Sequence, residues 1–325
     1  MAVMTMTDQL TSLEVAKRSD MSDSTRKIIE QLNVYNELLF DAPILPANQG
    51  TVDTHLVRTA LPHGEHRGYN QGVGKAASQT KTTKDVISNI EIYSTVDKQM
   101  VDDAPNPKEQ LQIEQNAFIE GLSQDITDDL IYGNHDADEL QTNGFAYRLN
   151  TVDNKKVISL QSTTTTGLTS IYLIKWGTDK CHIIYPRSSK SAGIEYKWLG
   201  EQTVKADDGS GEYQAYRAHY RVARGVSIGH EMSVIRICNI DLNASNVGES
   251  IAEAIVKAMP RLARGGGTVS IACNADVKSV MNIAALKKNN IVLPADDPWG
   301  NEVLKIGAAR FRECPSILTT ETLVS

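Results

Sequence analysis

The clearest pattern along the chain is an apolar stripe with helical spacing between positions 106 and 133. Its members recur at intervals of seven, four, four and four: Leu111, Phe118, Leu122, Ile126 and Leu130. Asn106 suits the N-cap, and Pro107 suits the first helical position. Glu109 fits a capping box, and Gly133 fits the C-cap. The pattern predicts a helix about 40 Å long, at about 1.5 Å per residue, with one exposed face.

The region before this helix alternates between polar and β-branched residues. A helix is predicted over residues 24–39, and "FDAPILPANQG" ends it. The segments "TVDTHLVRTAL" (51–61) and "DVISNIEIYSTV" (85–96) then flank a polar, glycine-rich stretch. Both are rich in Thr, Val and Ile, so they are predicted to be the two strands of a long hairpin with a glycine-rich tip. A long protruding hairpin cannot bury itself, so we expect it to need a partner.

After position 144 the pattern changes to strands. Strands are expected over 144–241, followed by helices over 247–262 and 275–287. The stretch "ARGGGTVSIACN" between those helices is typical of a loop, a buried strand and an N-cap at Asn274. The segment "VLKIGAARFRECPSILTTETL" indicates a last pair of strands. The uneven segregation of helices and strands favours an α+β fold over a regular βαβ repeat.

Composition narrows the classes of function. The 325 residues include 33 basic and 40 acidic side chains, giving a net charge of -7, the wrong sign for a protein whose main ligand is nucleic acid. The four cysteines lie far apart without zinc-like spacing, so we expect buried, reduced thiols: Cys181, Cys238, Cys273 and Cys314. The amino terminus has no secretion pattern, and no run has the length of a membrane span, so neither secretion nor membrane anchoring is expected.

Several short strings imitate catalytic motifs. "GVSIG" (225–229) matches the nucleophile elbow around Ser227, but strand-like sequence lies on both sides and no helix follows, which favours a plain strand serine. "GNHD" (133–136) and "DTH" (53–55) resemble two pieces of a two-metal phosphoesterase, yet the middle piece and the final histidine are missing. Metal-dependent phosphoesterase activity therefore remains only the alternative from another class.

Two further strings are weaker. "HGEH" holds His63 and His66 in a polar loop with no helix to set their spacing, so surface histidines are the favoured interpretation. "RGGG" at Arg264 lacks the Gly-Lys-Ser/Thr of a phosphate loop. The sequence predicts no catalytic residue, no metal site and no cofactor, and thus not an enzyme.

A longer series of strings carries a resemblance. In order they are "RTALP", "RGYNQGV", "YGN", the Trp-Gly at Trp176, "YPRSSKSAG", "LGEQTV", "YQAYRAHY", "IRICNID", "AMPRL" and "ARFRECPSILTTETL". From about residue 52 to the end, the chain closely resembles the major capsid proteins of short-tailed and related double-stranded DNA bacteriophages with the Hong Kong 97-type fold. The resemblance implies a structural subunit that self-assembles into the icosahedral shell around a phage genome. An encapsulin-like compartment shell is the alternative within that fold.

The resemblance also implies a domain plan and partners. The plan is an N-terminal arm (1–50), an extended hairpin loop with flanking strands (51–97), a peripheral domain with a long spine helix (98–150, completed by about 301–325) and an axial domain (151–300). The implied partners are other copies in hexamers and pentamers, a cement or decoration protein, and scaffold and portal proteins during assembly. Packaged double-stranded DNA is expected to make weak contact only, because tight phosphate binding would oppose filling and ejection. The expected location is the virion capsid, assembled in the host cytoplasm.

The hairpin and the spine region carry opposite charge. Residues 55–85 hold five Lys or Arg and two acids, net +3, whereas residues 97–139 hold two Lys and twelve acids, net -10. We therefore expect the hairpin of one subunit to contact the spine region of its neighbour. The expected loop residues are Arg58, His63, His66, Arg67, Lys75, Lys81 and Lys84. The expected spine residues are Asp102, Asp103, Glu109, Asp128 and Asp129.

Overall fold

The computed structural model describes residues 37–160, 162, 164–188, 195–206, 211–287, 293–296, 302–307 and 309–325. These residues group into two compact units. The first contains Asn89–Ile126 and Gly193–Val222, and the second contains Tyr35–Ser88, Thr127–Ala192 and Ala223–Ser325. The helix predicted over 24–39 lies almost entirely outside the described residues, since only its last positions fall in the 3-10 helix η1 (Glu37–Phe40).

The first unit packs a helix on a small sheet. Its elements are β4 (Ser88–Asp97), α2 (Lys98–Asp102), most of α3 (Pro107–Tyr132), β8 (Glu195–Lys205) and the first part of β9 (Glu212–Ile228). Strand β8 runs antiparallel to β9, which also pairs with β4. Phe118 of α3 stacks on Tyr220 of β9 with ring centroids 6.4 Å apart, and Leu122 and Ile126 are buried. The apolar stripe of the predicted helix thus provides its packing face.

The ends of α3 confirm the prediction and refine its capping. The Gln110 amide donates to the Asn106 carbonyl oxygen, and Asn106 Nδ2 donates to Glu109 Oε2 over 2.9 Å. The two side chains therefore bond to each other, whereas a capping box would direct each to a backbone amide. At the other end, a Cβ atom at Gly133 would collide with the backbone oxygen atoms of Asp129 and Thr142. Close chain approach therefore explains the glycine.

The second unit combines a mixed sheet with two helices on one of its faces. Its remaining elements are β1 (Ile44–Pro46), β2 (Val52–Ala60), β3 (Gln79–Val86), α4 (Phe145–Arg148), β5 (Val157–Ser159), β6 (Thr169–Trp176), β7 (Cys181–Tyr185), η2 (Glu231–Ser233), β10 (Val234–Ile240), α5 (Val247–Ala258), η3 (Met259–Arg261), β11 (Thr268–Cys273), α6 (Ala275–Lys287), β12 (Leu293–Asp296), β13 (Glu302–Ile306) and β14 (Ala309–Glu313). The strand order is β12-β13-β14-β11-β6, and β10 pairs with the other side of β6.

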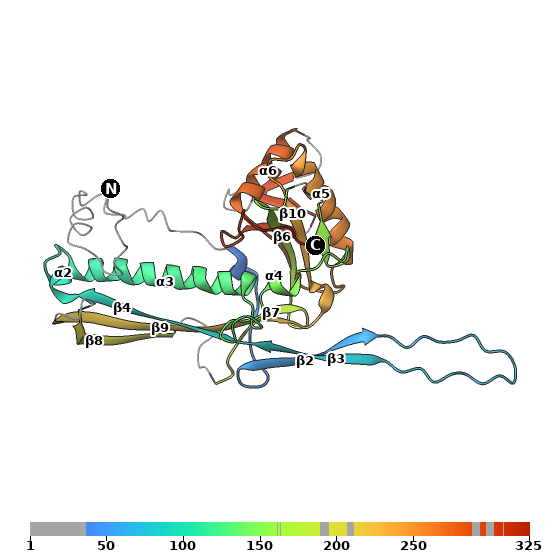
Figure 1. Cartoon of the computed structure of the whole chain (residues 1–325), viewed down its shortest axis with the longest axis horizontal. Helices are drawn as coiled ribbons and strands as arrows, with labels where there is room; N and C mark the ends of the chain where they lie inside the picture. The colour runs from blue at the N-terminus through green and yellow to red at the C-terminus, as the bar shows by residue number, and fades with distance from the viewer. Residues whose placement is uncertain are drawn as a thin grey trace. The chain divides into compact units, whose positions relative to one another are not determined.

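Helices α5 and α6 cover this sheet around one apolar core (Figure 1). The core joins Ile251 and Ile255 of α5 and Met281 of α6 to Leu173 and Ile235 of the strands. The two helices expected after residue 246 and most of the strands expected over 144–241 are confirmed, whereas residues 145–148 form the short helix α4 and the helix expected over 247–262 ends at Ala258, before η3. The four cysteines are buried free thiols as expected, and burial raises the pKa of Cys238 to about 11.

One expected pairing differs from the structure. The strand that pairs with β2 is β3, which begins in "QTKTTKDV" inside the predicted tip, whereas residues 88–97 form β4 and pair with β9. Strands β13 and β14 are present as expected, and they lie in one sheet with β11 and β6. These pairings are long-range, and local alternation of residues does not specify them.

A buried polar network fastens the C-terminal segment to the sheet. Glu321 Oε2 lies 3.0 Å from Arg236 Nη2, and Tyr132 donates to Glu321 Oε1 over 2.7 Å. Arg236 also donates to the Ser170 hydroxyl and to the Leu149 carbonyl oxygen. Burial alone lowers the pKa of Arg236, but Tyr172 and Glu321 raise it above its usual value, so the guanidinium stays charged.

This network gives the first prediction. Glu321→Ala leaves the Arg236 charge buried and unpaired, so the free energy of unfolding should fall by about 3–5 kcal/mol. Urea denaturation of the purified subunit measures this change. Glu253→Ala is the matched control, because its ion pair with Lys257 is exposed and contributes about 0.3–0.5 kcal/mol at most. Equal losses for the two variants would contradict the role assigned to the network.

Candidate inter-subunit surfaces

The hairpin is a two-stranded antiparallel sheet with a long tip. Strands β2 and β3 pair from Val52↔Val86 to Ala60↔Gln79, and residues 61–78 extend beyond them (Figure 1). The expected loop side chains His63, His66, Arg67, Lys75, Lys81 and Lys84 are all exposed. Arg58 lies in β2 opposite Thr80, and its side chain falls outside the described part. The hairpin therefore presents its positive charge to solvent.

The root of the hairpin is a buried cluster of charged and polar groups. Asp53 and Asp85 are directly paired across β2 and β3, an arrangement of like charges that is unfavourable on its own. Arg148 Nη2 lies 2.6 Å from Asp85 Oδ1, and the Ile228 amide donates to Asp85 Oδ2 over 3.2 Å. The Ser227 hydroxyl donates to Asp53 Oδ2 over 2.7 Å. These donors compensate both carboxylates and fix the hairpin to β9 and α4.

Two histidines complete the root cluster. His55 Nδ1 lies 3.7 Å from Asp85 Oδ2, and His182 Nε2 lies 3.7 Å from Asp53 Oδ2. Burial lowers the pKa of His182, opposed by Asp53, Asp85 and Asp179 and assisted by His55. His182 is therefore neutral near pH 7, and the hairpin root is built for the uncharged ring.

The root cluster gives a pH prediction. Because the folded pKa of His182 is below its unfolded value of about 6.5, the unfolded chain binds more protons as the pH falls through that value. The stability contributed by the neutral ring is thus complete above pH 6.5 and is lost below it. The free energy of unfolding, measured by urea at pH 7.5, 6.5 and 5.5, should fall more for the wild type than for His182→Gln. Parallel curves would contradict the assignment.

The same cluster accounts for the serine in "GVSIG". Ser227 is a buried residue of β9, as the sequence analysis favoured, and its hydroxyl proton is directed at Asp53. In a catalytic triad the histidine lies between serine and aspartate and accepts the serine proton. Here the aspartate lies between Ser227 and His182, so the hydroxyl has a structural role.

The side chains of the "GNHD" string form hydrogen bonds with nearby residues of the chain. Asn134 Oδ1 accepts bonds from the Asp136 and Ala137 amides, and His135 Nδ1 lies 3.0 Å from the Gln141 carbonyl oxygen. Tyr147 donates to Asp136. In the part of the chain that the structure describes, no group of three or more His, Cys, Asp or Glu side chains could hold a metal ion.

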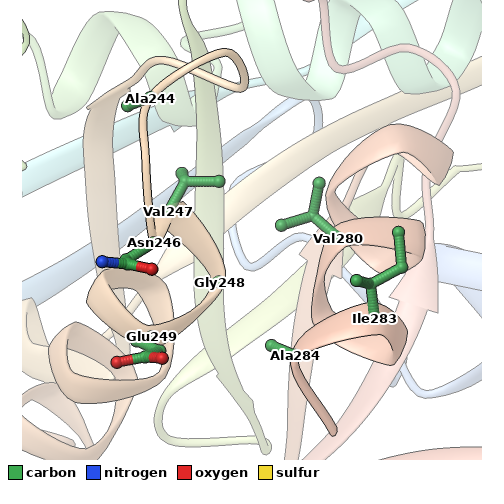
Figure 2. A pocket seen from close by; sticks show the side chains of 8 residues that line it. All are labelled: Ala244, Asn246, Val247, Gly248, Glu249, Val280, Ile283 and Ala284. Carbon is green, nitrogen blue, oxygen red and sulfur yellow. The ribbon is translucent and has the colours of Figure 1, made fainter. Parts of the chain in front are cut away.

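A shallow pocket lies between the start of α5 and α6 (Figure 2). It measures about 200 Å³ and is lined by Ala244, Asn246, Val247, Gly248, Glu249, Val280, Ile283 and Ala284. A Cβ atom at Gly248 would lie 2.7 Å from Ala284 Cβ, so this glycine permits the close approach of the helices. The lining is mostly apolar, without a nucleophile paired to a base, so it provides no catalytic arrangement.

The expected spine acids separate into two groups. Asp102, Asp103, Glu109 and Asp128 are exposed. Asp129 is partly buried, accepts bonds from the Ser88 hydroxyl and the Thr142 amide, and has its pKa raised by burial. Its carboxylate is used inside its own unit, so the spine surface retains the other four acids.

Neither the buried root nor the exposed Tyr69 at the hairpin tip was among the residues expected from the sequence. One signal was available for the root. Asp53, His55 and Val57 occupy alternate positions, which places them on one face of a strand. The neighbouring Leu56, on the other face, is exposed. Polar residues on the buried face mark a site where charged groups meet.

Comparisons with solved structures define the class of fold. The structure of bacteriophage Epsilon15 aligns with a TM-score of 0.71 at 21% identity and covers 99% of this chain and 99% of its own. The bacteriophage JBD30 capsid aligns with a TM-score of 0.53 at 11% identity and covers 94% of this chain and 99% of its own. The fold is therefore the Hong Kong 97-type fold of phage capsid proteins.

The family comparison goes further than the fold. The family described as major capsid protein GP7 matches residues 20–325, and the chain belongs to this family. It is a major capsid protein of a tailed bacteriophage, a structural subunit of the capsid shell. The search of curated proteins found no match. None of the described helices is long and apolar enough to cross a membrane.

Proposed function

We propose that the capsid shell is held together in part by the hairpin of one subunit lying against the spine region of the next, within hexamers and pentamers. The observation that carries this proposal is an exposed hairpin of net +3 in a chain whose residues 97–139 have a net charge of -10. Lys81 and Lys84 on β3 face solvent, as do Asp102 and Asp103 after β4. Opposite charges steer the two surfaces together and fix their register.

The domain plan fits this proposal. The unit with α3, β8 and β9 is assigned as the peripheral part, because it contains most of the long spine helix. The sheet with α5 and α6 is assigned as the axial part, which meets its copies at capsomer centres. Residues 1–50 are assigned as the arm. The role is structural and involves no catalysis, metal or cofactor.

Other proteins and the packaged genome are further proposed partners of the shell. A cement or decoration protein, a scaffold and a portal protein are proposed as partners during assembly in the host cytoplasm. The net charge of -7 supports weak contact with the packaged double-stranded DNA, because a shell lining that bound phosphates tightly would oppose filling and ejection.

A charge swap tests the hairpin–spine contact. The double variant Lys81→Glu/Lys84→Glu should raise the protein concentration needed for half-maximal shell assembly by about tenfold, since each exposed pair contributes roughly 0–1 kcal/mol and the reversal adds repulsion. Adding Asp102→Lys/Asp103→Lys should restore assembly. Sedimentation followed by electron microscopy measures the shells.

Wild-type assembly should also weaken as salt rises, because the Debye length is about 10 Å at 0.1 M and about 3 Å at 1 M.

The matched control reverses two exposed charges elsewhere, Lys155→Glu and Arg310→Glu. It should assemble like the wild type. Assembly of the loop variant at the wild-type concentration, with unchanged salt dependence, would show that charge does not hold the hairpin. Purified wild-type protein that never forms shells under any condition would refute self-assembly itself.

A further inference from the structure

The tip of the hairpin contains a small ordered turn. The Gln71 amide donates to the Gly68 carbonyl oxygen over 3.4 Å, and Asn70 has a left-handed backbone with φ of 63°. The Gly68 amide donates to Gln71 Oε1, and Arg67 Nε donates to the Gln71 carbonyl oxygen over 2.6 Å. Side-chain bonds of this kind hold the turn in one shape, and Tyr69 occupies its first corner.

The side chain of Tyr69 is fully exposed to solvent in the free subunit. Its relative exposure is 102%, and the apolar Leu61 and Val73 on either side are 62% and 55% exposed. Turn corners usually carry Gly, Pro, Asn, Asp or Ser, each for a conformational reason that does not apply to tyrosine. Tyrosine is instead enriched among the residues that dominate protein interfaces, because its large ring is apolar and its hydroxyl can still bond.

Two glycines beside this turn have no conformational reason in the free subunit. Gly64 and Gly72 do not have positive φ angles, and a Cβ atom on either would meet nothing within 4 Å. Gly68 differs, because a Cβ there would lie 3.0 Å from Gln71 Oε1. A glycine that its own chain does not require costs conformational entropy without local benefit. A surface that approaches the backbone closely would require it.

We propose that the hairpin tip docks into a recess on a second copy of this chain, with Tyr69 as the anchor and the backbone at Gly64 and Gly72 against the partner. This inference rests on the proposed function and deepens it. The partner is a second copy because the hairpin is positive and residues 97–139 of the same chain are strongly negative. Charge steers the hairpin, whereas the tyrosine ring and the bare backbone select one docked position.

Shell assembly by purified variants tests the anchor. Tyr69→Ala should raise the protein concentration for half-maximal assembly by about tenfold or more, as expected for an interface residue that dominates binding. Tyr69→Phe keeps the ring and should stay within about threefold of the wild type. The urea midpoint of the free subunit should not change for either variant, because the ring has no contact to lose. Assembly of Tyr69→Ala at the wild-type concentration would overturn the anchor role.

The glycines provide an independent readout. Gly64→Ala and Gly72→Ala should leave the stability of the free subunit unchanged or slightly raised, because alanine restricts the unfolded chain, while both impair assembly. Gly211→Ala is the matched control, since Gly211 also has open surroundings but lies outside the tip. It should assemble normally. Normal assembly of both tip variants would overturn the close approach of the backbone.

A photo-crosslinking phenylalanine analogue at position 69 separates this inference from the proposed function. It should link two copies of the chain on irradiation, whether or not complete shells form. The same analogue at Leu140, which is 79% exposed, is the control and should give no such product. Shells without a crosslink from position 69 would overturn the docking and leave the shell function standing. A crosslink from position 69 in a protein that never forms shells would support the docking and overturn the shell function.

Discussion

A two-stranded hairpin cannot enclose a hydrophobic core, and the stability of the extended hairpin is limited by this constraint. Strands β2 and β3 pair only the backbone groups that face each other, and of their apolar side chains that the structure describes, only Val57 is buried. Two strands alone are marginal in water, so the hairpin depends on contacts beyond its own two strands. One support is the root cluster within the subunit. The docking proposed for the tip would provide a second.

The root is built from polar groups, and this choice has a physical consequence. Asp53 and Asp85 face each other, so the site is unfavourable until Arg148, Ser227 and the Ile228 amide are all in place. An apolar root would tolerate several packing arrangements, whereas directed bonds to buried carboxylates accept few. The bonds that compensate the buried aspartates therefore fix the direction in which the hairpin leaves the sheet.

The sequence predicted the parts of the fold that depend on local signals. Helix α6 begins at Ala275 after the Asn274 cap and ends at Lys287, as the periodicity indicated, because helical bonds connect near neighbours. Strand β3 was missed because its exposed Lys and Thr residues lack the apolar alternation of a half-buried strand. The pairing of β14 with β11 joins residues 40 positions apart, Ser270 with Arg310, and no local pattern encodes it. The partial burial of Asp129 was not foreseen either, because its bond from Ser88, 41 positions away, is equally non-local.

The glycines of this chain fall into two groups, those that the structure of the subunit itself explains and those that it does not. Gly133 and Gly248 are explained by their own structure, since a side chain would strike the Asp129 backbone or the Ala284 methyl group. Open surroundings alone do not mark an interface, because Gly211 has them too. The tip differs in combining such glycines with a fully exposed tyrosine on an ordered turn. Neither the exposed tyrosine nor the open glycines stabilise the free chain. The docking proposed for the tip gives the tyrosine and the glycines one common role.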